Sequence, residues 1–417
     1  MAGHLFPRMY RIRQKFDLPA VNDIPAAVRD EIERLGLSSD IKKGDTVAVT
    51  AGSRNITEIV TILRTVIGVL ADLGATPFVI PAMGSHGGGT AEGQVELLRR
   101  YGITEESVGC PVCSSMETVN LGITDLGFPV LIDRIAYEAD HIVVLNRVKP
   151  HTRFTAPVES GLVKMCLIGL GKAEGARIYH RAIERFGWRD VYGQSFRILS
   201  EKTRLLFGLA LIENAHKKIG SIAALRPDRF LIDEPLLLSS ARSMMAGIPV
   251  AEIDLLVVDE MGKDISGTGM DTNVTGRKDG HSSIARCIFV RDLSAKAGGN
   301  SLGIGLSDFT TKRLVDKIDH HAMYLNARTA YRTDACKIPM TFESDIEAIE
   351  ASAFMCGIVD PAQFRVVWIR NTLELDTFHV SEACIHDVKK NRSLAIETGP
   401  IDIFTDPDNN LLTPHLY

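Results

Sequence analysis

The sequence predicts an α/β protein of two α/β domains, the first built on a Rossmann-like parallel sheet. Its 417 residues exceed the roughly 150 residues of a typical domain. Short β-branched runs alternate with helical patterns in both halves of the chain. A new strand pattern begins near residue 250, so we predict domains at 1–250 and 251–395. We expect residues 396–417 to form an irregular tail that packs back on the first domain.

The first elements predict a βαβ unit. Residues 46–50, TVAVT, are typical of a strand. Apolar residues then recur with helical spacing from 56 to 70, and Gly74 ends that helix. The run PFVIP at 77–81 predicts the next strand. The two strands of such a unit are parallel, and ligands bind beyond their carboxyl ends.

Two histidines follow predicted strands at that edge. His86 lies in the turn GSHGGGT, directly after the strand at 77–81 and before a helix predicted at 92–101. His151 follows the apolar strand HIVVLN at 141–146. Because carboxyl ends of parallel strands share one edge, both imidazoles are expected to reach a common pocket.

The remaining chain continues this alternation. Glycines separate two short helices, predicted at 161–171 and 173–186. In the second domain we predict strands at 254–259, 287–290 and 364–369, and a helix around 311–325.

Composition and charge exclude several classes of protein. Lys plus Arg number 47 and Asp plus Glu 52, a net charge of −5 without a basic cluster, so nucleic acid is not an expected partner. Charged residues interrupt every apolar stretch before the roughly 18 residues of a membrane span. The N-terminus lacks the apolar core of a signal peptide, and 7 scattered cysteines indicate reduced thiols. We therefore expect a cytoplasmic protein.

The turn after the first strand is a candidate anion site. Ser53 and Arg54 precede the helix, whose N-terminal amides attract a phosphate or carboxylate. A plain helix cap by Ser53 or Asn55 explains the same residues. The glycines that follow His86 are better explained by close approach of a ligand than by packing.

Four side chains are candidates for chemistry. Imidazoles give and take protons near neutral pH, which suits His86 and His151. Lys164 precedes an apolar stretch, where burial would lower the pKa of its amine and make it nucleophilic. His180 could bind nickel, copper, zinc or iron, but one histidine needs further ligands from a cofactor. A core histidine and a solvated lysine are the ordinary alternatives.

Three other patterns lack the context that their chemistry requires. CPVC at 110–113 has no second cysteine pair at zinc-finger spacing. GNSLG at 299–303 resembles a hydrolase motif, but no strand leads directly into it and no helix follows. The glycines at 169, 171 and 175 follow a helix and miss the dinucleotide-binding spacing. We assign no chemistry to these segments.

Several short motifs in the first half of the chain occur together in one order. They are Ser53-Arg54 after a strand, Gly84-Ser85-His86, Pro150-His151, Ser160-Gly161 shortly before Lys164, and then His180. In this combination the sequence resembles the nickel-pincer nucleotide-dependent lactate racemase family.

The resemblance implies a cofactor and a role for each candidate. In that family a nickel-pincer nucleotide, a pyridinium-3,5-bisthiocarboxylic acid mononucleotide, is covalently attached to the lysine that matches Lys164. The family residue that matches His180 is a nickel ligand, and the residues that match His86 and His151 act as acid and base. The residue that matches Arg54, which lies beside Ser53, holds anionic groups. The family fold has a larger N-terminal domain with the cofactor, a smaller C-terminal α/β domain, and the active site in the cleft.

The resulting hypothesis is an isomerase, a racemase or epimerase of a 2-hydroxy acid that uses reversible hydride transfer to this cofactor. A hydride route avoids a carbanion beside the carboxylate. The partners would be the substrate and the enzymes that make the cofactor. Two alternatives stay open: a dehydrogenase or isomerase with a diffusible nucleotide, and a non-catalytic nucleotide-binding homologue. The substrate side chain and the oligomeric state are left open.

The second domain offers polar candidates for substrate contacts, although none matches a family motif. They lie in the glycine-rich loop and are Lys263, Asp271, Asn273 and Arg277.

Overall fold

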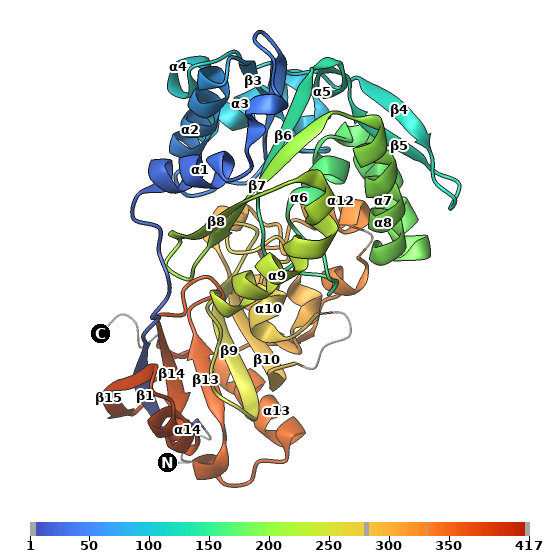
Figure 1. The fold of residues 1–417 in the computed structure, drawn as a ribbon. Helices are drawn as coiled ribbons and strands as arrows, with labels where there is room; N and C mark the ends of the chain where they lie inside the picture. The colour runs from blue at the N-terminus through green and yellow to red at the C-terminus, as the bar shows by residue number, and fades with distance from the viewer. Residues whose placement is uncertain (1–5, 279–282, 331, 413–417) are drawn as a thin grey trace. The chain divides into compact units, whose positions relative to one another are not determined.

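The computed structural model describes residues 6–278, 283–330 and 332–412. The chain divides into two compact units (Figure 1). The first, called here the cofactor unit, comprises Leu18–His151 and Thr155–Met245. The second, called the C-terminal unit, contains the chain up to Asp17, the short segment Thr152–Phe154 and the chain from Ala246 onward.

The cofactor unit is built on a five-stranded sheet in the order β3-β2-β6-β7-β8. The first four strands in this order are parallel, and β8 is an antiparallel edge. The predicted α/β class and the predicted parallel βαβ unit are confirmed. The strands are β2 (Thr46–Ala51), β3 (Thr76–Pro81), β6 (His141–Arg147), β7 (Leu205–Glu213) and β8 (Ile219–Leu225).

Helices cover both faces of this sheet (Figure 1). Successive side chains of a strand point to opposite faces, so Val47 and Val49 join one apolar cluster and Ala48 the other. Strands buried on both sides are largely apolar, as β2 is apart from its two threonines. The first cluster contains α1 (Ile24–Glu33) and α2 (Ile59–Asp72); the second contains α6 (Leu162–Lys164), α7 (Lys172–Phe186), α8 (Trp188–Lys202) and α9 (Phe230–Ser243).

Smaller elements complete this unit. The helix predicted at 92–101 is α3. Of the two helices predicted between 161 and 186, the first is a short α-turn followed by a π-helical turn, Met165–Gly169, and the second is α7. The remaining elements are α3 (Ala91–Arg100), α4 (Glu105–Val108), the hairpin of β4 (Thr118–Ile123) and β5 (Pro129–Asp133), and α5 (Arg134–Glu138).

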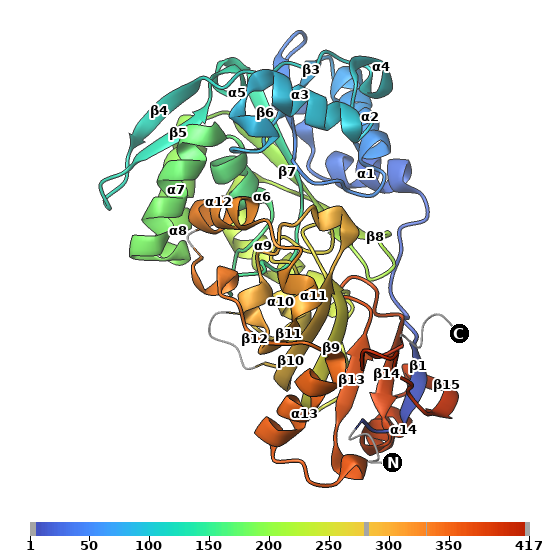
Figure 2. The same cartoon turned by 180° about the vertical axis from the view of Figure 1, so that it is seen from behind.

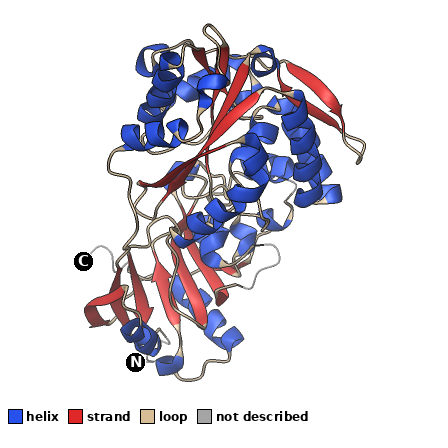
Figure 3. Ribbon diagram, viewed as in Figure 1, coloured by secondary structure: helices blue, strands red, loops and turns tan. Residues whose placement is uncertain are grey.

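The C-terminal unit contains an eight-stranded mixed sheet, several strands of which Figure 3 shows side by side. Its order is β12-β11-β10-β9-β13-β14-β1-β15, parallel as far as β13 and antiparallel beyond. The strands are β12 (Met340–Phe342), β11 (Phe309–Thr311), β10 (Ala285–Leu293), β9 (Ile253–Met261), β13 (Val366–Ile369), β14 (Thr377–Ser381), β1 (Met9–Gln14) and β15 (Leu394–Ile401).

The strands predicted in this half are present as β9, β10 and β13. The single helix expected around 311–325 is two helices, α11 and α12, because residues 316–319 form a turn between them. The helices are α10 (Thr272–Thr275), α11 (Lys312–Val315), α12 (His320–Ala330), α13 (Asp345–Cys356) and α14 (Ile385–Lys390).

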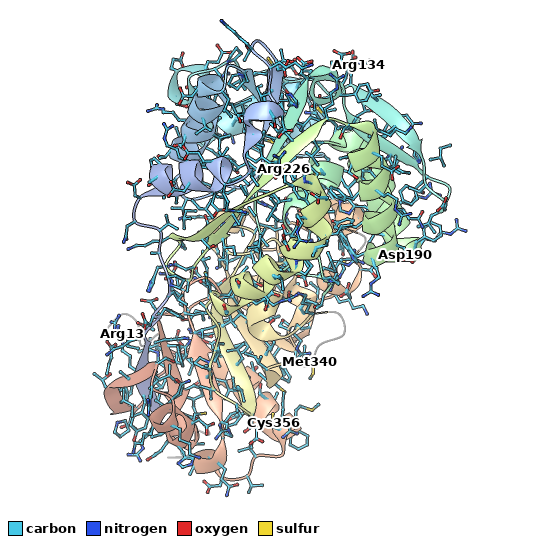
Figure 4. All side chains as sticks on the ribbon, viewed as in Figure 1. Arg13, Arg134, Asp190, Arg226, Met340 and Cys356 are labelled. Carbon is cyan, nitrogen blue, oxygen red and sulfur yellow. The ribbon has the colours of Figure 1, made fainter. Side chains whose placement is uncertain are left out.

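The two ends of the chain differ from the predicted domain boundaries. β1 lies between β14 and β15 in both views (Figures 1 and 2), so residues 9–14 belong to the C-terminal unit rather than to a 1–250 domain. Residues 396–401 are part of β15 instead of an irregular tail on the cofactor unit. Arg13, labelled in Figure 4, pairs with Glu397 across the two strands. Such pairing over nearly 400 residues has no local signal in the sequence.

No helix within the described ranges is long and apolar enough to cross a membrane.

A buried ion-pair network stabilises the C-terminal unit. Arg291 of β10 donates to Asp345 at 2.6 Å and to Asp259 at 2.5 Å. Asp259 also accepts from the indole of Trp368 at 2.7 Å, and the guanidinium lies 5.2 Å from that ring. Since all of these groups are removed from water, removal of one charge leaves the others uncompensated.

We expect Arg291→Met to lower the free energy of unfolding by about 3–5 kcal/mol, the usual cost of breaking a buried pair. Urea denaturation monitored by the fluorescence of Trp368 in a Trp188→Phe background measures it. Arg370→Met, which removes pairs of an exposed arginine with Glu260 and Glu374, is the control and should cost less than about 1 kcal/mol. Equal effects of the two substitutions would contradict the role given to the network.

Candidate functional site

Three loops follow neighbouring strands at one edge of the cofactor-unit sheet. β3, β2 and β6 are adjacent and parallel, so their carboxyl ends lie together. The loop after β2 carries Ser53 and Arg54, the loop after β3 carries His86, and the loop after β6 carries His151. The topology therefore places four of the predicted residues at one edge, as the sequence indicated.

The loop after β2 is fixed by contacts with other elements. The hydroxyl of Tyr101 donates to the carbonyl of Ser53 at 2.9 Å, and the amide of Thr57 donates to Glu213 at 2.7 Å. α2 begins only at Ile59, after Glu58 in the left-handed region. The expectation that Ser53 and Arg54 stand at a helix N-terminus, and that Ser53 or Asn55 caps it, is wrong. Arg54 is instead exposed on a separate turn.

The turn that carries His86 packs on the segment after Lys164. The amide of Gly84 donates to the carbonyl of Gly169 at 3.1 Å, and a Cβ at Gly84 would lie 3.0 Å from the carbonyl of Ile168. A Cβ at Gly87 would meet the backbone of Gly93 at 2.7 Å, so packing does explain this glycine, contrary to the sequence prediction.

The loop after β6 returns to its own strand. The amide of Lys149 donates to the carbonyl of Ser160 at 2.8 Å, and the side chain of Asn146 donates to the carbonyl of Gly161 at 2.7 Å. These bonds close the loop, so α6 and Lys164 begin next to the end of β6.

Glu159 organises the interior of that loop. It is fully buried, accepts the backbone amides of His151 at 2.5 Å and Ala156 at 3.0 Å, and pairs with Arg242 at 2.5 Å. The ring of His151 lies 5.4 Å from that of Trp188. His151 is thereby held through its backbone on one side and its ring on the other.

A second buried carboxylate positions Lys164. Glu234 of α9 accepts the amide of Val163 at 3.0 Å at the start of α6. A Cβ at Gly161 would lie 2.2 Å from this carboxylate, so a larger residue there would displace it. Burial raises the pKa of Glu234 from 4.5 to about 7, partly offset by the backbone amides of Val163 and Leu162.

The charged groups around Lys164 shift the pKa values of Lys164 and His86. Burial, and then the charges of Lys149 and Arg54, lower the pKa of Lys164 from 10.5 to about 8, while Glu159 opposes the shift. Partial desolvation of its ring, and then the charges of Arg54 and Lys164, lower the pKa of His86 from 6.5 to about 4, although the residue is exposed. Arg54, His86 and Lys164 therefore lie within electrostatic reach of each other. His86 is neutral and the Lys164 amine partly neutral near pH 7–8.

His180 lies on α7, the helix that follows the π-helical turn after Lys164, and is half-buried. Within the described ranges, no group of three or more His, Cys, Asp or Glu side chains could hold a metal ion. A nickel ion at His180 would therefore depend on ligands from the cofactor.

The charge balance of the site suits an anionic cofactor. The charges of Lys149, Arg54 and Glu159 all act on Lys164. Arg54 is exposed and has no ion-pair partner in the part of the chain that the structure describes. A phosphate or carboxylate group would offset the charge of Arg54.

A family comparison covers the part of the chain that carries these residues. Residues 13–187 match the family model of the lactate racemase N-terminal domain. This part of the chain is similar to that domain family, and it contains all the predicted site residues, from Ser53 to His180.

A solved structure shares the fold. It is that of the lactate racemase apoprotein from Thermoanaerobacterium thermosaccharolyticum, with a TM-score of 0.50 and 15% sequence identity over 84% of this chain and 96% of that one. At this identity the likeness concerns the fold, and it supports the two-domain α/β class. No curated protein sequence matches the chain.

The remaining sequence candidates have structural partners. Arg277 pairs with Asp308 at 2.5 Å, and Asp271 caps α10 through the amide of Asn273. Lys263 donates to the carbonyl of Gly267 at 2.6 Å. A role in substrate binding for these residues stays a prediction.

The patterns set aside in the sequence are structural. Ser301 of the hydrolase-like GNSLG is fully buried and lies 3.1 Å from the sulfur of Met323. Burial raises the pKa of the Cys110 thiol to about 11, which keeps it protonated.

We expect Lys164 to be acylated as an amine with a pKa of about 8. Pulsed acetic anhydride labelling across pH 6–10, with peptide mass spectrometry, measures this pKa against exposed lysines in the same sample. Lys149→Met should raise the pKa because it removes a neighbouring positive charge. Glu159→Gln should lower it because it removes the opposing negative charge. Labelling of Lys164 only above pH 10 would contradict the assigned environment.

Glu234 makes the stability of the cofactor unit depend on pH. Its folded pKa of about 7 exceeds the ordinary 4.5, so its contribution to the free energy of unfolding should fall as pH rises from about 4.5 to 7, by about 3 kcal/mol. The lowered pKa of His86 acts in the opposite direction over this range, so the measured quantity is the difference in unfolding free energy between the parent protein and Glu234→Gln, read by urea denaturation at several pH values. This difference should decrease as pH rises. Glu201→Gln, at an exposed helix position, should keep the pH dependence of the parent protein; the same result for Glu234→Gln would exclude this carboxyl as a source of pH dependence.

Proposed function

We propose that the protein is an isomerase that racemises or epimerises a 2-hydroxy acid. One observation carries the proposal: Arg54, His86 and Lys164 lie within electrostatic reach at the carboxyl edge of a parallel sheet, in the part of the chain that matches the lactate racemase N-terminal domain. The buried Glu159 links His151 to this group, since it binds the amide of His151 and acts on the charge of Lys164.

Two imidazoles suit a reaction that must run in both directions. His86, whose pKa is about 4, is neutral at physiological pH and can accept the hydroxyl proton of the substrate. His151, held by Glu159 and Trp188, would return a proton on the opposite side. Each such group typically contributes about 10²–10⁴ in rate.

The residues present fit the nickel-pincer nucleotide. The partly neutral amine of Lys164 would carry it, His180 would ligate nickel, and Arg54 with Ser53 would bind anionic groups. When bound, the cofactor supplies the hydride acceptor and donor that no side chain provides. Enzymes that build the cofactor are the partners that this proposal requires.

The main alternative is a dehydrogenase or isomerase that uses a diffusible nucleotide. The second alternative is a non-catalytic nucleotide-binding homologue. The half-buried amine of Lys164, with its lowered pKa, favours an attached cofactor, because binding a diffusible nucleotide does not require a nucleophilic amine.

Production together with the cofactor-making enzymes tests the proposal. We expect an adduct of several hundred daltons at Lys164 by intact mass, about one nickel per chain, and interconversion of the enantiomers of a 2-hydroxy acid by chiral chromatography. Lys164→Arg should lose the adduct and Lys149→Arg should retain it. A nucleotide that dialyses away without adding mass would support the diffusible alternative.

In the loaded protein, His86→Ala should lower racemisation by about 10²-fold or more while nickel is retained. Undiminished activity of this variant would remove His86 from the mechanism.

A further inference from the structure

A second buried lysine lies close to the site but outside the assigned chemistry. Lys172, at the start of α7, is fully buried, and so is Asp133 at the end of β5. The two charges are 2.7 Å apart. The ammonium also donates to the carbonyl of Pro81 at 2.7 Å and lies 3.4 Å from the side-chain oxygen of Gln94.

The backbone at Lys172 shows that this side chain has a specific role. Its φ is +53°, in the left-handed region that costs a residue other than glycine about 1–2 kcal/mol. Glycine would avoid this cost but would leave Asp133 without its cation. The ammonium therefore explains why a lysine occupies the position.

Gln94 connects the ion pair to the turn that carries His86. Its side chain is fully buried on α3. The amide nitrogen donates to the carbonyl of Gly84 at 2.9 Å and to that of His86 at 3.3 Å, while the oxygen faces Lys172. A continuous series of polar contacts thus runs from Asp133 through Lys172 and Gln94 to the backbone of the turn.

Stability alone is a weak explanation for such an arrangement. Replacing a buried ion pair with apolar residues of similar volume is often neutral or stabilising. Apolar residues could not donate hydrogen bonds to the carbonyls of residues 81, 84 and 86. These hydrogen bonds set the direction of the turn.

We infer that Lys172 and Gln94 are positioning residues for His86, and that Asp133 anchors them. The network joins the end of β3, the start of α3, the end of β5 and the start of α7. The turn of His86 is thereby held against the segment that follows Lys164. The catalytic meaning of this arrangement rests on the proposed function, but the structural claim does not.

Gln94→Leu tests the claim without changing any charge. A loosened turn moves the imidazole away from Arg54 and Lys164, whose charges lower its pKa. The pKa of His86, read by NMR of ¹³C-labelled histidine in the protein without cofactor, should rise by about one unit or more towards 6.5. Hydrogen exchange of residues 84–90 should quicken about tenfold or more. Comparison with His86→Gln assigns the resonance.

Leu98→Ala is the matched control. Leu98 is buried on the same helix, in the apolar cluster of the sheet, and has no bond to the turn. This variant should lose stability and keep the pKa of His86 near 4. Lys172→Met should raise the pKa as Gln94→Leu does, and the double variant should add little to either single change because both interrupt one series of contacts.

The outcomes separate this inference from the proposed function. An unchanged His86 pKa in Gln94→Leu, or an equal rise in Leu98→Ala, would overturn the positioning role whatever the activity. If the pKa of His86 rises in Gln94→Leu but not in Leu98→Ala, the positioning role is supported. If the protein then does not racemise hydroxy acids, only the proposed function is refuted. In an active enzyme, Gln94→Leu should lower kcat about tenfold or more with little change in KM.

Discussion

The parallel pairing of β2 with β3 and β6 is the constraint on which the site depends. Residues 54, 86 and 151 are far apart in the chain, and they share an edge only because three adjacent strands run the same way. In an antiparallel sheet, alternate loops would leave from opposite edges. The apolar character of these strands secures the arrangement, since helices bury them on both faces.

The second constraint is the distribution of charge at that edge. Lys149 and Arg54 act on Lys164, and Arg54 and Lys164 act on His86. These positive charges have two consequences. They add to the larger effect of desolvation in favouring the neutral forms of His86 and Lys164, and they favour an anionic ligand.

The sequence was sufficient to predict the elements that obey local rules. The strands at 46–50, 77–81 and 141–146 and the helix at 92–101 follow from β-branched runs and helical periodicity, and all are present. Features made by distant residues were not predictable. Glu234 reaches α6 from α9, more than seventy residues away, and β1 joins β14 and β15 from the other end of the chain.

Within the site, residue type was easier to predict than local geometry. Lys164 was singled out from the apolar run after it, and the structure does depress its pKa. The turn at Ser53 and Arg54 was expected to begin a helix, but α2 starts at Ile59. Glycine and polar residues permit several turns, and contacts from Tyr101 and Glu213 select one of them. No pattern along the chain encodes that selection.

Two lysines in one short segment show that burial alone does not determine chemistry. Burial lowers the pKa of both Lys164 and Lys172. Asp133, 2.7 Å from Lys172, counteracts this and favours the charged form, which suits a structural ion pair. Lys164 instead has Lys149 and Arg54 as neighbours, and they add to the effect of burial. The partner of each ammonium decides which lysine supports the backbone and which offers a free amine.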